Sequence, residues 1–437
     1  MFGKKSKSEF DGSSRILISF IKNGSANHQN AKRLTQIARR ISNRANFIMR
    51  KDLFTGRKPN QSKVDKLLKT GTLSPNDKEL YCRFPAAVSQ RSIQIVGDNW
   101  SGFAAAKADW KMNSDKYSSA PRPPKYVKSA KTVYIPCSSF YVKSDTLYFA
   151  KRLGIKPIPT KSGLFPDQKY NPKAATKVVN EIRIVPTGSG FKFEIIYDKH
   201  RLSDFLSDNT QSVLLDKSSF LSIDLGVSRF AALVSNKADV SPILINGGEL
   251  KRINQWYNKR CAELRSNGKY RHIKSVAGKR NRQVKDKLHK ISRYITNLCM
   301  KHDIGTVIVG KNLLWKQEIN IGKKNNQNFT HIPHAQFIDM LAYKLKEIGI
   351  TLQQQEESYT SKASFLDNDA MPTYGSEKGD KPAFSGRRFM RGLYKTRDGV
   401  LVHADINGAG NISRKAGYKG ASLVSGGVVM TPMLVGL

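Results

Sequence analysis

The chain has 437 residues, with 75 Lys or Arg against 34 Asp or Glu and a formal net charge of +41. Such an excess of positive charge is costly in self-repulsion unless a polyanion neutralises it, so we expect a nucleic acid as the main partner and no membrane attachment. The 4 cysteines lie far apart, which fits neither a disulfide framework nor paired zinc knuckles, and a chain of this length can bury more than one core.

The N-terminal region begins with the basic segment MFGKKSKSEF, which lacks the apolar core of a secretory signal, and no later stretch is apolar enough to span a bilayer. We therefore expect a cytoplasmic protein. Residues 15–21 predict a strand, and residues 30–54 carry apolar side chains at helical spacing between many basic ones. Charge runs of this kind are commonly solvated helix faces, but the arginine density favours contact with phosphates by Arg39, Arg40 and Arg44.

A second helical stretch covers residues 85–112 and ends before the prolines of 118–126. From there to about residue 215 the pattern changes to short alternating runs, and a Gly-Ser-Gly between two of them indicates a hairpin. These features predict a β-rich domain that the helical segment interrupts, with the strand at 15–21 as a possible member. The interleaved aromatic residues could stack on bases, although on strands they more often belong to the core.

The C-terminal half alternates strands and helices, which predicts an α/β domain with a mixed sheet. The strand in SSFLSIDLG (218–226) ends in Asp224, and Asp405 in HADINGAGN (403–411) precedes a short helix. Open α/β sheets carry their chemistry at the C-terminal ends of strands. The other expected elements are helices at 249–264 and 282–303 with a basic, Gly-containing break between them, a strand at 304–310, a helix at 334–349 and a strand at 350–358.

Asp224 and Asp405 are candidate metal ligands. The carboxylate of Asp224 ends an otherwise apolar strand, where partial burial is costly unless a cation pairs with it. Each acid alone has an ordinary explanation, because Asp is common at strand-end turns and at helix N-caps. Together at one sheet edge they could bind Mg, and a third acid would complete a two-metal site for phosphodiester cleavage.

Three motifs in order, SIDLGVSRFAALV, YTSKAS and ADINGAGNI, resemble the RuvC-type nuclease motifs of TnpB proteins, the transposon-encoded RNA-guided nucleases related to compact type V CRISPR effectors. The resemblance is strong over residues 218–415 and rests on segment order elsewhere. It implies a multidomain α+β chain with an RNase H-like (RuvC) α/β nuclease domain and an N-terminal wedge-type β-barrel interrupted by a helical recognition domain. It also implies a guide RNA, a double-stranded target DNA cleaved beside a short transposon-associated motif, and two Mg ions in one site.

The chain departs from the family pattern twice. Family members usually end the middle strand with a metal-binding glutamate, whereas this strand reads TVIVGKNLLWK and carries Gly310 and Lys311 there. Members also tend to place two CxxC knuckles after YTSK, whereas residues 363–403 contain no cysteine, so no zinc is expected.

Glu356 and Glu357 in QQQEESYTSK could supply the missing carboxylate, because in an RNase H-like sheet their strand lies beside the one that lost its acid. Successive strand residues point to opposite faces, so one of the two is expected to face Asp224 and Asp405. We favour Glu357, which is nearer the strand end. The alternative is that both are solvated acids in an inactive protein. The other acids of the interval, Glu318, Asp367 and Asp369, are less well placed.

The resemblance divides the chain into a wedge-like barrel (1–29 and 119–215), a helical recognition domain (30–118), a RuvC-like domain (216–358 and 404–437, with a basic helical insertion at 249–303) and a target-nucleic-acid-binding insert without zinc knuckles (359–403). The insertion and the insert are basic, and the insert interleaves its arginines with aromatics, which suits contact with a nucleic acid strand. The candidate contacts there are Lys259, Arg260, Arg280, Arg282, Arg387, Arg388 and Arg391.

Three functions fit these observations. The leading one is an RNA-guided DNA endonuclease in which Asp224, Glu357 or Glu356, and Asp405 bind Mg. The second is a catalytically inactive RNA-guided DNA-binding protein, and the third is a guide-independent RNase H-like transposase or recombinase. The sequence leaves the choice between a monomer and a dimer open.

Overall fold

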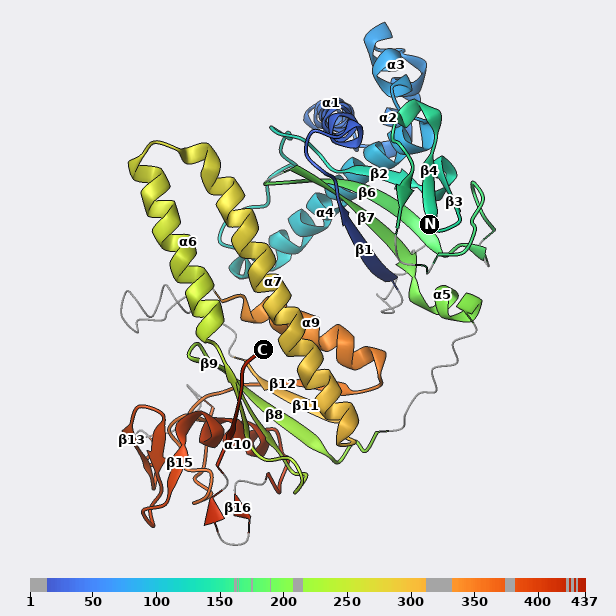
Figure 1. Cartoon of the computed structure of the whole chain (residues 1–437). Coiled ribbons are helices and arrows are strands. Elements are labelled where there is room, and N and C mark those ends of the chain that lie inside the picture. Colours follow the sequence, from blue (N-terminus) through green and yellow to red (C-terminus); the bar gives the residue numbers. More distant parts are fainter. Residues whose placement is uncertain are drawn as a thin grey trace. The chain divides into compact units, whose positions relative to one another are not determined.

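The computed structural model describes residues 14–437, apart from residues 161–162, 164, 174–175, 189, 207–214, 312–331, 374–381, 422–423, 426–427 and 430. The chain divides into two compact units, Met1–Thr210 and Gln211–Leu437 (Figure 1). No helix in the described ranges combines the length and the apolar character that a membrane crossing needs.

Unit 1 contains an antiparallel sheet in the order β1-β7-β6-β2 and a smaller sheet in the order β3-β4-β5. The first strand of the chain pairs with the last long strand of the unit, Ser14 facing Asp198. No closed barrel is found among the strands that the structure describes. Their bounds are β1 Ser14–Phe20, β2 Val133–Pro136, β3 Phe140–Lys143, β4 Thr146–Phe149, β5 Ile158–Pro159, β6 Val179–Thr187 and β7 Gly190–Asp198.

Four α-helices and a short 3-10 helix (Ser114–Lys116) lie between β1 and β2 in the sequence. The first begins earlier than the apolar pattern predicts, because the side chain of Ser25 caps it by accepting a hydrogen bond of 3.2 Å from the backbone N–H of His28. Its apolar residues at helical spacing are buried, as an amphipathic helix requires. The helices are α1 Ala26–Phe54, α2 Gln61–Thr70, α3 Pro75–Cys82 and α4 Ala86–Met112, and α5 Lys199–Leu206 follows β7.

Unit 2 is built on a six-stranded mixed sheet in the order β12-β11-β8-β9-β10-β18. The strands β12, β11 and β8 run parallel, whereas β9 is antiparallel to both of its neighbours. The tail adds β18 parallel to β10, so it folds back onto this unit. The strands are β8 Phe220–Leu225, β9 Arg229–Ser235, β10 Ile243–Asn246, β11 Thr306–Gly310, β12 Thr351–Gln355 and β18 Met433–Val435; β16 Val424–Ser425 and β17 Val428–Val429 pair separately.

Helices cover both faces of this sheet (Figure 1). One face packs on α6 (Gly248–Ser266), α7 (Tyr270–Lys301) and α9 (His334–Glu347), through Leu221, Ile223 and other apolar residues. The opposite face packs on α10 (Ala404–Lys415), where Phe220, Ile308 and Ile412 meet. Because strand residues alternate, Asp224 belongs to the α10 face.

The structure corrects one detail of the expected α6–α7 region. The predicted basic break between the two helices is short, because α7 begins at Tyr270 and contains most of that segment. The two helices form a long antiparallel hairpin (Figure 1).

The insert between β12 and α10 forms an antiparallel sheet of β13 (Arg387–Met390), β14 (Leu393–Lys395) and β15 (Leu401–His403). Two acids secure it: the carboxylate of Asp369 accepts from the backbone N–H groups of Ser364 (2.7 Å) and Ser385 (3.1 Å), and Asp367 accepts from the Ser385 hydroxyl (2.8 Å). Hydrogen bonds to charged acceptors therefore hold this cysteine-free segment.

Candidate active site

The C-terminal ends of three parallel strands meet at one edge of the unit 2 sheet. Val309 of β11 pairs with Ile223 of β8 and with Gln354 of β12. The next residues along these strands are Asp224, Gly310 and Gln355, so Asp224 and Gly310 lie at equivalent positions on neighbouring strands. A side chain at either position points to the α10 face.

The first turn of α10 brings Asp405 to this edge. His403 precedes the helix, and its Nδ1 accepts a hydrogen bond of 3.3 Å from the backbone N–H of Asp405. The helix can approach β8 closely because Gly408 has no side chain: a Cβ there would lie 2.6 Å from Oδ2 of Asp224. The hydroxyl of Ser222 donates to the carbonyl of Ala409 at 2.7 Å and fixes the contact.

The electrostatics of Asp224 reflect this crowding. The pKa of Asp224 is raised to about 7, mainly by burial and also by the negative charge of Asp405, while the positive charge of Arg388 acts in the opposite direction. Such a carboxylate is costly to ionise unless a cation enters. Asp224 and Asp405 therefore form an acidic pair at the sheet edge.

Glu357 occupies the space that the absent side chain of Gly310 leaves. A Cβ on Gly310 would lie 2.7 Å from Cδ of Glu357, closer than real atoms approach. The pKa of Glu357 is raised to about 8, mainly by burial and also by the negative charges of Asp224 and Glu356. The Glu357 carboxylate thus lies over the middle strand, within the electrostatic reach of Asp224.

Glu356 has a different environment from its neighbour. Its carboxylate forms an ion pair of 2.5 Å with Nζ of Lys415 at the end of α10, and it accepts hydrogen bonds from the N–H and the hydroxyl of Ser358. Burial acts to raise the pKa of Glu356, but the hydrogen bonds from Lys415 and Ser358 outweigh it and lower the pKa. Because β12 ends at Gln355, Glu356 and Glu357 are the first two residues after this strand.

Several residues of this region were not predicted from the sequence. Lys415 is one, and the amide side chains of α10 are others: Asn411 donates to the carbonyls of Thr360 (2.9 Å) and Ala363 (2.7 Å), and Asn407 donates to Ala363 at 2.8 Å. These bonds tie the YTSKAS segment to the helix that carries Asp405. The only sequence signal was the pair of asparagines in NGAGN, four residues apart and thus on one helix face.

No three His, Cys, Asp or Glu side chains within the described ranges are gathered closely enough to form a ready-made metal site. Asp224, Asp405 and Glu357 are nevertheless linked in pairs by their charges. Carboxylate oxygens are the ligands that Mg prefers, and the burial of Asp224 and Glu357 makes their charged forms costly unless a cation pairs with them. The chemistry of this donor set therefore fits a divalent ion. The less favoured acids Asp367 and Asp369 hold the insert, and Glu318 lies outside the described residues.

The arginines of the insert lie near this edge. Arg387, Arg388 and Arg391 are exposed, and Nη2 of Arg391 donates to the hydroxyl of Ser228 at 3.4 Å. The charge of Arg388 reaches Asp224 and also His403, whose pKa is lowered first by burial. These exposed guanidinium groups can contact a phosphate backbone at the acidic edge.

The basic side chains expected on α6 and α7 differ in exposure. Lys259, Arg260 and Arg282 are exposed, and Nη1 of Arg260 pairs with Glu263 at 2.7 Å. Arg280 is half-buried and donates to Oδ1 of Asn254 at 2.8 Å, so it connects the two helices.

The arginines expected on α1 are also unequal. Arg40 is exposed. Arg44 forms a bidentate ion pair with Asp77 at 2.8 and 2.9 Å, and Arg39 donates to the carbonyl of Lys128 at 3.3 Å. Arg44 therefore has a structural partner within unit 1.

Two family models match parts of the C-terminal half of the chain. Residues 208–316, which include Asp224 and Gly310, match the family OrfB_IS605, described as a probable transposase. Residues 334–412, which include both glutamates and Asp405, match the family Cas12f1-like, TNB domain. A comparison with curated proteins gives no match.

Three solved structures are similar to the chain at low identity. A Cas12f1–sgRNA–target DNA complex is 16% identical with a TM-score of 0.35, and the match covers 92% of this chain and 99% of that chain. A CRISPR-Cas12f ternary complex is 16% identical with a TM-score of 0.35, covering 88% and 80%. The mini-RNA-guided endonuclease CRISPR-Cas_phi3 is 11% identical with a TM-score of 0.34, covering 70% and 61%. TM-scores of this size do not establish a common fold.

Proposed function

From the premise that the chain is TnpB-like, we propose that it is an RNA-guided DNA endonuclease whose single nuclease site consists of Asp224, Glu357 and Asp405. The observation that carries the proposal is the placement of the Glu357 carboxylate over Gly310. The family pattern requires an acid on the middle strand, and this chain supplies it from the segment that follows the neighbouring strand β12. Asp224 and Asp405 complete the set from β8 and α10.

The strand order of unit 2 supports an RNase H-like (RuvC) domain as part of this proposal. Three sequential strands, β8, β9 and β10, form an antiparallel meander, and β11 and β12 add parallel to β8 on its other side. We assign the sheet of unit 1 to a wedge-like domain, and residues 30–118 to a recognition domain. The insert at 359–403 takes the role of the target-nucleic-acid-binding segment, with acid-to-amide hydrogen bonds in place of zinc.

Asp224, Glu357 and Asp405 would hold Mg ions, which supply a Lewis acid for the phosphate and a lowered pKa for the attacking water. The residues of the chain perform the remaining tasks. The charge of Arg388 at the edge of the acidic pair attracts the scissile phosphate and orients it. Lys415 holds Glu356 away from Glu357 through its ion pair, which limits the repulsion between the adjacent carboxylates.

The guide RNA would read the target by base pairing, while the protein binds duplex shape and a short flanking motif in the cytoplasm. The basic charge of the chain supports binding of both polyanions. A catalytically inactive RNA-guided binder and a guide-independent transposase share this charge, so activity and bound RNA distinguish the three.

The test is Mg-dependent cleavage of a matched duplex by the protein purified with its RNA. Three isosteric variants are compared: Asp224→Asn, Glu357→Gln and Glu356→Gln. We expect the first two to lose about 100-fold or more in rate, because each removes a charge from the site, and the third to retain most activity. Equal loss in both glutamate variants would contradict the assignment of Glu357. Tight duplex binding without cleavage by the wild type would support the inactive binder, and absence of RNA would support the transposase.

A further inference from the structure

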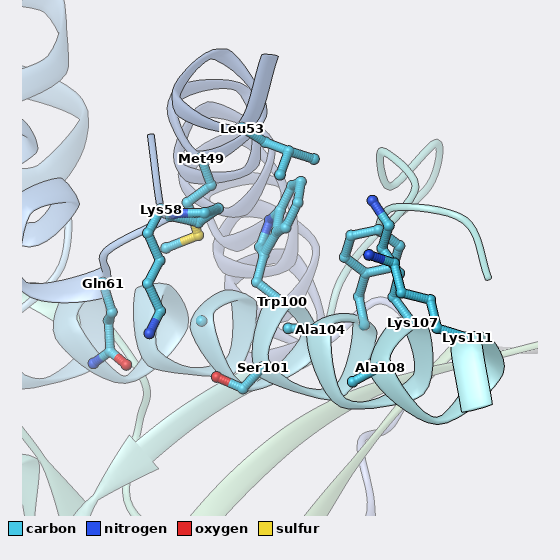
Figure 2. Close-up of a pocket in the computed structure, with 13 residues that line it drawn as sticks. Met49, Leu53, Lys58, Gln61, Trp100, Ser101, Ala104, Lys107, Ala108 and Lys111 are labelled. Atoms are coloured by element: carbon cyan, nitrogen blue, oxygen red, sulfur yellow. The ribbon is translucent and has the colours of Figure 1, made fainter. Parts of the chain in front are cut away.

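A cavity of about 430 Å³ in unit 1 opens between α1, α2 and α4, far in sequence from the nuclease motifs. Met49 and Leu53 of α1 and Trp100 and Ala104 of α4 line it, as Figure 2 shows. The wall is mainly apolar, which is typical of a ligand site. It lies in the segment that the proposed function assigns to recognition.

The aromatic wall of the cavity is rigid. Trp100 is only 4% exposed, and its indole N–H donates to Oδ1 of Asn46 at 2.9 Å. The ring of Phe103 meets the Trp100 ring edge-on, with centroids 5.7 Å apart and planes at 89°, and Phe103 is partly exposed. Trp100 thus fixes Phe103, and a flat ring can stack on the accessible part of Phe103.

Small residues on α4 keep the space open. Gly97 lies against Gln61, since a Cβ there would be 2.8 Å from Oε1 of Gln61. Ala104 and Ala108, one turn apart, are exposed to the cavity and fill little of it. A larger side chain at Ala104 or Ala108 would occupy the cavity without displacing buried residues of α4.

Lysines border the cavity on two sides. Figure 2 shows Lys107 and Lys111 on one side of Trp100, and Lys58 with Gln61 on the other. Lys107 and Lys111 are exposed one turn apart, and neither has an ion-pair partner in the described part of unit 1. An apolar cavity with lysines on both sides is complementary to a flat ring that has an anionic group on each side of it.

We propose that this cavity binds one unpaired nucleotide of the RNA that the protein carries, with its base against Phe103 and its two flanking phosphates at the lysines. The inference rests on the proposed function, because it requires a bound RNA. RNA is favoured over duplex DNA because its loops and bulges already offer unstacked bases, whereas a base in duplex DNA must first be unpaired. The site would fix the position of the RNA on unit 1.

The experiment compares Ala104→Leu, which fills the cavity, with the matched control Ala105→Leu. Ala105 is the adjacent exposed residue of α4 and does not line the cavity. The probe is the RNA that copurifies with the wild-type chain, studied by filter binding and by nucleotide-resolution chemical probing. In Ala104→Leu we expect one unpaired nucleotide to gain reactivity and the affinity to fall about 5- to 100-fold, the worth of one stacked base. Ala105→Leu should match the wild type in both readouts.

Lys58→Gln on one side of Trp100 and the double variant Lys107→Gln/Lys111→Gln on the other provide an independent measurement. Each should reduce the slope of log affinity against log salt concentration by about 0.7, the value for one lost phosphate contact in a single strand. The inference is overturned if Ala104→Leu binds the RNA as the wild type does, or if only its binding to duplex DNA weakens. If the wild type carries no RNA, the proposed function fails as well. If the wild type carries RNA and Ala104→Leu binds this RNA with the same affinity, the nucleotide pocket is ruled out while the proposed function stands.

Discussion

Gly310→Ala is expected to destabilise unit 2 because its new methyl group would enter the space of the Glu357 carboxylate. The added Cβ would lie 2.7 Å from Cδ of Glu357 and 2.7 Å from Cδ1 of Ile412. Overpacking by a methyl group in a filled site costs about 1–3 kcal/mol. Ile412 is fully buried and contributes its own share of this cost, so the part that comes from Glu357 has to be measured separately.

The part of this free-energy cost that comes from Glu357 can be isolated with a double-mutant cycle of Gly310→Ala and Glu357→Ala. If the carboxylate lies where the structure places it, Gly310→Ala should cost about 1–2 kcal/mol less in the Glu357→Ala background, which is a typical coupling between residues in contact. The assay is native-state hydrogen exchange of the β11 amides in EDTA, which reports the free energy of opening unit 2.

Gly278→Ala on α7 is the control for replacing glycine. Its Cβ would meet only Nη1 of Arg282, at 3.6 Å, so it should stabilise the helix by up to about 1 kcal/mol. The reasoning is refuted if Gly310→Ala costs the same with and without the Glu357 side chain. It would also be refuted if Gly310→Ala retained full cleavage activity, because displaced Glu357 could no longer serve the site.

Three further outcomes are expected. In metal-free protein, the pKa of Glu357 is about 8 in the folded state and about 4.5 in the unfolded state, so the folded protein loses stability as the pH rises from about 4.5 to 8. Glu357→Gln cannot ionise, so its free energy of unfolding should fall less between pH 5 and pH 8 than that of the wild type. The difference should be at least about 1.4 kcal/mol, the equivalent of one pKa unit, in urea unfolding at the two pH values. Lys415→Met should raise the pKa of Glu356 and destabilise unit 2 by about 1–3 kcal/mol, and an unchanged thermal midpoint would contradict the role of this ion pair. Asp369→Ala should lower the free energy of unfolding by about 1.5–3 kcal/mol and speed proteolysis within the insert, because the backbone N–H of Ser385 loses a charged acceptor. Asp398→Ala, at an exposed turn, is the control and should change neither quantity.

The composition and the strand-end pattern already determined much about this protein. A net charge of +41 predicts a polyanionic partner whatever the fold, because self-repulsion depends on the number of charges. Asp224 could be identified as a candidate from one short segment, since an acid at the end of an apolar strand is a local signal. Asp405 needed the family motif as well, because an Asp at the start of a helix is common.

Only the tertiary structure distinguishes Glu356 from Glu357. The sequence predicts that adjacent strand residues point to opposite faces, but it does not fix where β12 ends or what lies beside each carboxylate. The register of β11 and β12 and the absence of a side chain at Gly310 place Glu357 at the acidic edge, while Lys415 from α10 pairs with Glu356. These contacts join residues about 45 to 60 positions apart, so local patterns carry no information about them. The cavity of unit 1 has the same origin, because Met49 and Trp100 in its wall are also far apart in the sequence.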